Sequence, residues 1–440
     1  MSRKPRGHTS SAIASIAVAM LLLAACAVGG GDDDSADGKV TLTFLTGDDD
    51  QILIPSKAVA EAFMRENPDV EIDIETQPGG SEGDNLIKTR LATGEMSDMF
   101  LYNSGSLFQA LNPEQTLTPL TDEPWISDTH EGFLASTTAG DDYFGAPIGS
   151  AGAGGFLYNR DVYEDLGLEV PKTWDEFMAN NERTKQAGID PVMGTYVDTW
   201  TAQIVMLADF HNILAQDPEW ADKYTANEAK YQDEPAVSSF EKLAELHDQG
   251  YMNQDFASSR LDEGLEQVAS GEAAHYPALS LSIGQMVNNY PESAEGVGFF
   301  PIPGDDPSIN GFTAWMANAI YIPNTTTGDD LDAALRFLEF LASPAGCNAQ
   351  TKASPPTGPY MVQSCTLPKD LPVAVEDMLP YFAEENGTSP ALEFLSPVKG
   401  PALEQICVEV GSGIRSADDG AALYDEDVEK QAQQLGLEGW

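Results

Sequence analysis

The folded part of the chain opens with a period-2 alternation of apolar and polar residues over 40–47, which predicts a strand with one buried face. Residues 56–67 then carry apolar side chains at helical spacing, with Ser56 able to cap the helix and Pro68 following its end. The alternation resumes over 70–74. A strand, a helix and a strand in about 35 residues form a βαβ unit with parallel strands and a right-handed crossover. The predicted fold class is therefore α/β.

Later segments continue this mixture of helices and strands. Residues 98–102 form a short apolar strand. Thr173 and Glu176 make a capping box, and Gly188 sits where such a helix ends. Apolar residues between 331 and 341 share one helical face. No repeat of about 20–50 residues is visible, so a solenoid is not expected.

Length and composition indicate two globular domains of ordinary size. The chain has 440 residues, too many for one compact core, and its 42% apolar residues can fill two. The 71 Asp and Glu against 22 Lys and Arg leave a net charge of −49. A surface this acidic repels phosphate backbones, which excludes nucleic acid as a partner. Negative charge also keeps an exposed protein soluble, so the acidity alone identifies no function.

The N-terminal segment has the pattern of an export signal. Basic residues precede an apolar run over 11–25 that ends in Leu-Ala-Ala before Cys26. As a helix of roughly 22 Å the run is too short to span a membrane. Its ending resembles the lipobox of bacterial lipoproteins, which implies that residues 1–25 are a signal peptide and that Cys26 is acylated. The alternative is an ordinary secreted protein whose cysteine happens to follow the cleavage point.

The segment 26–38 is small and acidic, so it is predicted to be a flexible tether, and the folded body begins near Lys39. An exported protein can also form disulfides. Cys347 and Cys365 flank a loop rich in Pro and Gly, and closing it would stabilise the fold by roughly 3 kcal/mol. This pairing is favoured and would leave Cys407 as a buried thiol, although the sequence alone allows three pairings.

Signs of catalysis are few. The pattern Gly-x-Ser-x-Gly at 79–83 resembles a nucleophile elbow around Ser81, but no other triad signal accompanies it, and a plain turn is favoured. The five histidines lack metal-ligand spacing, and no phosphate-binding or zinc-protease motif occurs. Counting alone leaves a glycosidase-like carboxylate pair open, although nothing points to one. We therefore expect a protein that is not an enzyme and holds neither metal nor cofactor.

Six stretches, in order along the chain, resemble the extracellular solute-binding family 1 of bacterial ABC importers, a sugar-binding family that includes maltose-binding protein. They are Gly94–Phe100, Phe144–Pro147, Gly155–Asp161, Val170–Phe177, Thr199–Thr201 and Ala269–Ala274. Each stretch alone is weakly specific, whereas their shared order is specific, and the similarity runs from Lys39 to about Arg415. The chain departs from the family at Arg160, where lysine is commoner.

The resemblance implies a two-lobed, periplasmic-binding-protein-like fold, each lobe a mainly parallel sheet with flanking helices. Three hinge segments would cross between the lobes, near 147–151, 311–315 and 393–396. The resulting bounds are 39–148 plus 314–394 for lobe one and 149–313 plus 395–440 for lobe two.

A sugar presents hydroxyls and flat apolar faces, so its site needs aromatic surfaces and fixed polar groups. The resemblance implies that Tyr158 contacts the sugar and that Trp200 stacks on it. Trp315 lies at the second crossing. A large aromatic side chain is hard to explain as part of a linker, so Trp315 is also predicted to contact the sugar. Trp174, in the first turn of a capped helix, is assigned to packing. Polar candidates at strand ends are Asp48, Asp49 or Asp50, then Asn103 and Ser104, and more weakly Glu82.

The sequence thus predicts a lipid-anchored, monomeric protein on the extracellular face of the cytoplasmic membrane. It would capture a sugar or short oligosaccharide between its lobes and deliver it to an ABC permease. Ligand would bridge both lobes, and closure would follow from its higher affinity for the closed form. Two alternatives stay open. The same fold could bind a polyamine, a peptide or a metal chelate, and a secreted polysaccharide hydrolase or lyase would use two of the many carboxylates.

Overall fold

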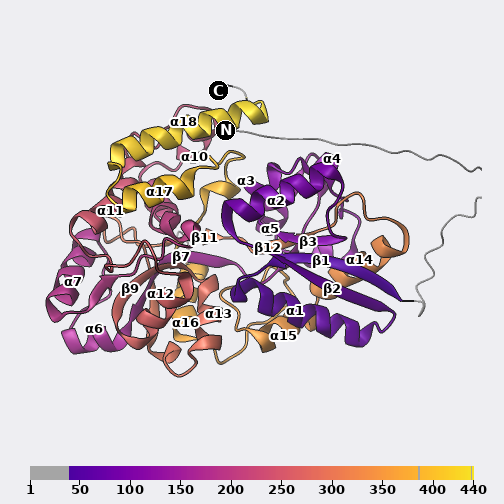
Figure 1. Cartoon of the computed structure of the whole chain (residues 1–440), viewed down its shortest axis with the longest axis horizontal. Helices are drawn as coiled ribbons and strands as arrows, with labels where there is room; N and C mark the ends of the chain where they lie inside the picture. Colours follow the sequence, from indigo (N-terminus) through magenta and orange to yellow (C-terminus); the bar gives the residue numbers. More distant parts are fainter. Residues whose placement is uncertain (1–38, 385–386, 438) are drawn as a thin grey trace, which may run out of the picture. The chain divides into compact units, whose positions relative to one another are not determined.

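The computed structural model describes residues 39–384, 387–437 and 439–440, which fold into two large β-sheets with helices packed around them (Figure 1). Residues 39–440 form one compact unit by themselves. The predicted signal peptide, Cys26 and the tether lie outside the described residues. Among the helices of the described ranges, none has both the length and the hydropathy to cross a membrane.

The first sheet contains the predicted βαβ unit. Strands β1 (Val40–Gly47) and β2 (Val70–Gln77) pair in parallel along their whole length, and α1 (Asp50–Glu66) connects them. Their alternation buries Leu42, Phe44 and Ile72. The sheet order is β2–β1–β3–β12–β6, completed by β3 (Met99–Tyr102), β12 (Asn318–Tyr321) and β6 (Ala146–Ile148).

Helix α1 begins at Asp50, six residues before the predicted cap at Ser56 (56 − 50 = 6). The prediction of Ser56 as a cap is wrong because this serine satisfies its hydroxyl inside the helix. Its Oγ donates to the carbonyl of Ile52 at 2.7 Å and lies 3.1 Å from Oγ1 of Thr46. A serine that bonds the carbonyl four residues back is compatible with a helix interior, so the local sequence did not fix the start.

The second sheet has the order β13–β11–β7–β9–β8, and β10 also pairs with β7. Its strands are β7 (Gly152–Asn159), β8 (Asp190–Val192), β9 (Ala273–Leu279), β10 (Val297–Pro301), β11 (Phe312–Trp315) and β13 (Thr388–Pro390). A separate small hairpin consists of β4 (Thr138–Ala139) and β5 (Asp142–Tyr143).

Both large sheets are mixed. The expected parallel pairing holds for β1, β2 and β3 in the first sheet, and for β8 with β9 and β11 with β13 in the second. In contrast, β12 runs antiparallel to β3 and β6, and β7 runs antiparallel to β9, β10 and β11. The prediction of mainly parallel sheets is therefore wrong, because strands that enter from the other sheet pair in the opposite direction. The chain passes from β6 to β7 over residues 149–151 and from β11 to β12 over 316–317.

The helices cover both sheets (Figure 1). Around the first sheet lie α2 (Gly80–Thr93), α3 (Ser106–Gln109), α4 (Pro113–Thr116), α5 (Glu131–Ser136), α14 (Gly328–Leu341) and α15 (Pro344–Ala353). With the second sheet go α6 (Arg160–Leu166), α7 (Trp174–Ala187), α8 (Ile204–Ala208), α9 (Phe210–Gln216), α10 (Trp220–Thr225), α11 (Val237–Asp248), α12 (Leu261–Ser270), α13 (Leu281–Asn289), α16 (Val373–Ala383), α17 (Leu403–Gly411) and α18 (Ala417–Leu435). The short 3-10 helices are η1 (Pro124–Asp128), η2 (Thr199–Gln203), η3 (Ala294–Gly296) and η4 (Leu392–Phe394).

The predicted helix ends at α7 are confirmed. Oγ1 of Thr173 accepts the N–H of Glu176 at 3.2 Å, while the Glu176 carboxylate accepts the N–H of Lys172. Gly188 ends the helix with φ of 82°, a left-handed conformation that glycine adopts without a steric cost.

Each sheet has apolar cores of its own. Phe44, Phe63 and Phe337 pack together against the first sheet, and Phe156, Phe177 and Phe300 against the second. Helix α16 packs against β10, and β13 pairs with β11, so both belong to the second sheet. The C-terminal helices α17 and α18 also contribute to the core of the second sheet.

The cysteines of the described part match the favoured pairing. Cys347 and Cys365 form a disulfide that closes a sequence separation of 18 residues. Cys407 is a free thiol on α17, fully buried, and burial raises its pKa. It is therefore unreactive at neutral pH.

Candidate functional site

A cavity of about 390 Å³ lies between the two sheets, within the usual size range of small-molecule sites. One wall consists of the carboxyl ends of β1, β2 and β3 and the N-terminal part of α2. Parallel strands place such ends along one edge of the sheet, where ligands of α/β proteins bind. The other wall consists of η2, α8, the end of β11, the loop 397–401 and the start of α17.

Two half-buried tryptophans border this cavity, both from the second sheet's side. Trp315 ends β11, opposite Gly152 of β7, and Trp200 lies in η2. Gly154 leaves room for the Trp315 indole, since a Cβ at this glycine would lie 2.8 Å from Cζ3 of the ring. Partly exposed indoles at a cavity wall offer flat surfaces that a ligand with apolar faces can stack on.

Three polar atoms at the cavity are buried and have no hydrogen-bond partner among the described residues. They are Oε1 of Gln77, Oγ of Ser106 and Oε1 of Gln203, whereas the hydroxyl of Tyr102 lies beside the Asp84 carboxylate. An unpaired buried polar group costs about 1–3 kcal/mol, so such groups are normally satisfied by protein, water or a ligand. Both walls of the cavity therefore contribute polar groups that can hydrogen-bond a ligand.

Positively and negatively charged side chains lie close to one another at the cavity. Nζ of Lys399 lies 3.6 Å from a carboxylate oxygen of Glu393, and both side chains are largely buried. Asp84 has Lys88 and Lys399 nearby, and burial raises the pKa of its carboxyl. The lysines thus partly offset the negative charge of the carboxylates at the cavity.

Glu404 connects the two walls. Its Oε2 accepts a hydrogen bond from Oγ of Ser81, at the start of α2, at 3.1 Å, and another from Oγ1 of Thr199, before Trp200, at 2.9 Å. A negative charge beside the first turn of α2 is also favoured by the helix dipole. The carboxylate thus holds α2, η2 and its own helix α17 together at the edge of the cavity.

Three of the candidates that the sequence predicts border the cavity, namely Trp200, Trp315 and Asn103. Two others lie elsewhere. Tyr158 is buried in the second core, with its ring centroid 4.6 Å from that of Tyr163 and 5.4 Å from that of Phe300. Ser104 is also buried, and its hydroxyl donates to the carbonyl of Ala317 at 3.1 Å.

The acidic candidates lie near the rim rather than on the cavity wall. Asp48 and Glu82 are exposed, and Asp50 is exposed at the first turn of α1. Asp49 is half-buried, with Oδ2 close to Gly79. Its pKa is raised to about 6, first by burial and then by the charges of Asp48 and Asp198.

Trp174 is confirmed as a packing residue. It is buried in the second core, and its Nε1 donates to Glu245 at 2.8 Å. Ser81 lies in the first turn of helix α2 rather than in a plain turn, and its hydroxyl bonds the Glu404 carboxylate instead of a histidine. Within the described ranges, no group of three or more His, Cys, Asp or Glu side chains could hold a metal ion.

Gln77, Tyr102 and Glu404 were missed by sequence reasoning. Gln77 and Tyr102 are the last residues of β2 and β3, so strand ends were the available signal. Glu404 lies far along the sequence from the other cavity residues, and no local pattern connects it to them.

The model of the bacterial extracellular solute-binding protein family matches residues 53–346. The chain belongs to this family. A multiple sugar-binding protein of Streptococcus mutans is 23% identical over 288 residues, which are 63% of this chain and 66% of the relative, just under two thirds of its length. The melibiose/raffinose/stachyose-binding protein MelE of Bacillus subtilis is 23% identical over 336 residues, 73% of this chain and 74% of the relative.

Solved structures with the same fold include a chitin oligosaccharide binding protein and the binding protein RafE in complex with raffinose. The first has a TM-score of 0.78 at 20% identity and covers 90% of this chain and 99% of its own. The second has a TM-score of 0.72 at 18% identity, and the match covers 90% of this chain and 100% of RafE. The predicted α/β class and two-lobed periplasmic-binding fold are thus confirmed. Members of the family are extracellular binding proteins, in agreement with the predicted export.

Proposed function

We propose that the protein captures a sugar or short oligosaccharide in the cavity between its lobes and delivers it to an ABC permease, without chemical turnover. The convergence of Trp200, Trp315 and the unpaired polar atoms on one cavity carries this proposal. Indoles can stack on the apolar faces of a pyranose, while the polar atoms bind its hydroxyls. The sugars in the names of the two relatives support the same ligand class.

Delivery depends on a change between open and closed lobes. The open form would expose the cavity, and ligand that touches both walls would favour the closed form by its differential affinity. The sequence predicts that lobe one includes 314–394. The packing of α16 on β10 and the pairing of β13 with β11 support a shorter segment for lobe one, which ends before residue 373.

We also propose that the protein is held to the membrane by a lipid anchor. Acylation of Cys26 would hold the protein to the outer face of the cytoplasmic membrane, with 26–38 as the tether and a single folded copy as the working unit. The motif that ends in Cys26 supports this part, and mass spectrometry of the membrane fraction tests it through the mass of the lipidated N-terminal peptide.

The central experiment is calorimetry of residues 39–440 against raffinose, stachyose and chitin oligosaccharides, with spermidine as the test of a cationic ligand. Trp200→Ala and Trp315→Ala should each weaken saccharide binding by about 2 kcal/mol, roughly thirtyfold, because each removes a stacking surface. Trp440→Ala is the control, since Trp440 packs beside Lys230 and does not border the cavity. Binding of spermidine alone, or recovery of a cleaved saccharide, would refute the proposal.

A further inference from the structure

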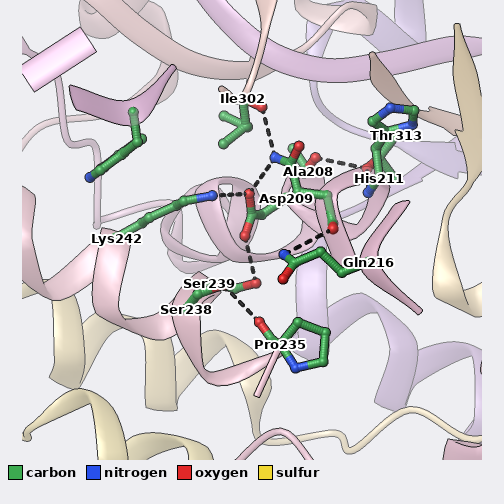
Figure 2. Close-up of polar contacts among 12 residues, drawn as sticks. Ala208, Asp209, His211, Gln216, Pro235, Ser238, Ser239, Lys242, Ile302 and Thr313 are labelled. Atoms are coloured by element: carbon green, nitrogen blue, oxygen red, sulfur yellow. Dashed lines mark hydrogen bonds and ion pairs between the residues drawn. The ribbon is translucent and has the colours of Figure 1, made fainter. Parts of the chain in front are cut away.

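Thr313 connects the two segments that carry the cavity's tryptophans, although it is fully buried and does not itself border the cavity. It lies on β11, two residues before Trp315 (315 − 313 = 2). Its hydroxyl donates to the carbonyl of Ala208 at 2.7 Å and accepts the backbone N–H of His211 at 2.9 Å (Figure 2). Both groups belong to the junction of α8 and α9, and α8 follows η2, which carries Trp200.

The junction is a break between α8 and α9. Thr313 hydrogen-bonds the two backbone groups that lose their helical partners at this break. In a continuous helix the N–H of Asn212 would donate to the carbonyl of Ala208. Here it donates to the carbonyl of Asp209 at 2.9 Å instead. A hydroxyl is one donor and an acceptor, so a single oxygen serves both Ala208 and His211. A side chain of the same shape without the hydroxyl would leave two buried backbone groups unpaired.

The Trp315 indole and the methyl group of Ala208 both lie over Gly154. A Cβ at this glycine would lie 2.7 Å from Cβ of Ala208 and 2.8 Å from Cζ3 of Trp315, so the absence of a side chain leaves space that both groups use. A shift of Ala208 therefore changes the surroundings of the Trp315 indole. The same shift is passed along α8 toward Trp200, because both lie on one continuous stretch of helical turns.

The far side of the junction is held by a buried polar network (Figure 2). The carboxylate of Asp209 pairs with Nζ of Lys242 and accepts hydrogen bonds from Nδ2 of Asn212 at 2.7 Å and Oγ of Ser239 at 2.9 Å. Nδ2 of Asn212 also reaches the carbonyl of Ile302 at 3.0 Å. A buried charge is tolerated only with such a full set of partners, so the junction has one favoured position on α11. Thr313 then fixes β11 to that position.

We propose that Thr313 is a positioning residue that sets the spacing of the Trp200 and Trp315 indoles and so determines which saccharides the cavity holds. This inference rests on the proposed function, because it takes the two indoles as the surfaces on which ligand stacks. Binding geometry must be held within about 0.5 Å by supporting contacts, and a site on a loosened support loses affinity while it keeps its residues.

The first test needs no ligand. The protein is labelled with 5-fluorotryptophan, and the ¹⁹F resonances of its six tryptophans are assigned by single Trp→Phe exchanges. Thr313→Val should shift the Trp200 and Trp315 resonances in residues 39–440, and Thr313→Ser, which keeps the hydroxyl, should restore them. Thr184→Val is the matched control, because Thr184 is fully buried and its hydroxyl bonds the carbonyl of Asn181 within α7, away from the cavity. Unshifted resonances in Thr313→Val overturn the proposal.

The second test measures the dissociation constant for raffinose at 25 °C, with stachyose as the longer probe. Thr313→Val should raise both constants at least about tenfold and change their ratio, and Thr313→Ser should stay within about twofold of the unchanged protein. A merely structural threonine would lower Tm, as Thr184→Val should, and leave both constants unchanged, which overturns the proposal. If Thr313→Val does not fold, Thr313→Ala takes its place with the same expectations. Failure of the unchanged protein to bind any saccharide refutes the proposed function, and the ¹⁹F result still decides the positioning role.

Discussion

Asp49 lies in surroundings that disfavour its charge. It follows β1 at the rim of the cavity, half-buried, with Asp48 and Asp50 beside it in the sequence and Asp198 approaching from the segment before η2. Burial raises its pKa first, and the three negative neighbours raise it further, to about 6. The folded arrangement, which brings Asp198 near Asp49, therefore costs more when Asp49 is ionised.

Replacing Asp49 by asparagine should stabilise the protein at neutral pH and not in acid. Below pH 3.8 the carboxyl is protonated in both the folded and the unfolded state, so the exchange is neutral. Between pH 3.8 and about 6 only the unfolded state ionises, and the penalty on folding grows until it is complete above pH 6. Urea unfolding at pH 4 and pH 8 measures the difference.

The control for this prediction is Asp73→Asn on β2. It makes the same exchange of a carboxylate for an amide, at an exposed position. We expect a gain of about 1 kcal/mol for Asp49→Asn at pH 8, after allowance for its partial exposure to solvent. An equal gain at both pH values, or an equal gain in Asp73→Asn, would contradict the role assigned to its surroundings.

At the scale of elements, Glu404 holds α2, η2 and α17 in contact. Two hydroxyls, from Ser81 and Thr199, donate to the same carboxylate oxygen. A second, separate contact between helices of the two sheets runs from Oγ of Ser282 on α13 to Oε1 of Gln51 on α1, at 3.2 Å. Both contacts favour the arrangement in which the two walls lie close together.

Glu404→Ala should shift the ligand-free protein toward the open state. Hydrogen bonds to a charged group contribute about 1.5–3 kcal/mol each when buried, and these partly exposed ones less, so a shift of roughly tenfold in the open-to-closed ratio is expected. Small-angle scattering should then report a larger radius of gyration for the variant. Glu409→Ala on the same helix is the control, because Glu409 pairs with Arg415 instead. Equal radii for the two variants would show that Glu404 does not hold the walls together.

The net charge of −49 acts on the molecule as a whole. Like charges repel more strongly in the compact state than in the extended chain, and salt screens this repulsion over about 10 Å at 0.1 M. Tm should therefore rise by several degrees (~3–6 °C) between 20 mM and 1 M salt. Scanning calorimetry in NaCl and in KCl checks this, since screening predicts equal effects. A falling Tm would show that attractive pairs dominate.

The candidate site could be predicted in part. Trp200 and Trp315 have the residue type that sugar stacking needs, and both border the cavity. Tyr158 is also aromatic, but it lies on β7 with its side chain in the core beside Phe300. Which face of a sheet a strand residue points to depends on what packs against the sheet. Gln203 and Glu404 are ordinary polar residues along the sequence, and they gain a role only where the fold brings distant segments together.

The sequence by itself determined local elements, because the βαβ unit and the capped helix after Thr173 follow from residue spacing over short stretches. It favoured the pairing of Cys347 with Cys365 among three possibilities, and the structure decided it. Only the tertiary structure decided the direction of β7, the cavity and the contacts that hold Trp315. The physical reason is range. Periodicity and capping act between residues a few positions apart, whereas a cavity is the space left by side chains from many segments, and its shape depends on how all of them pack.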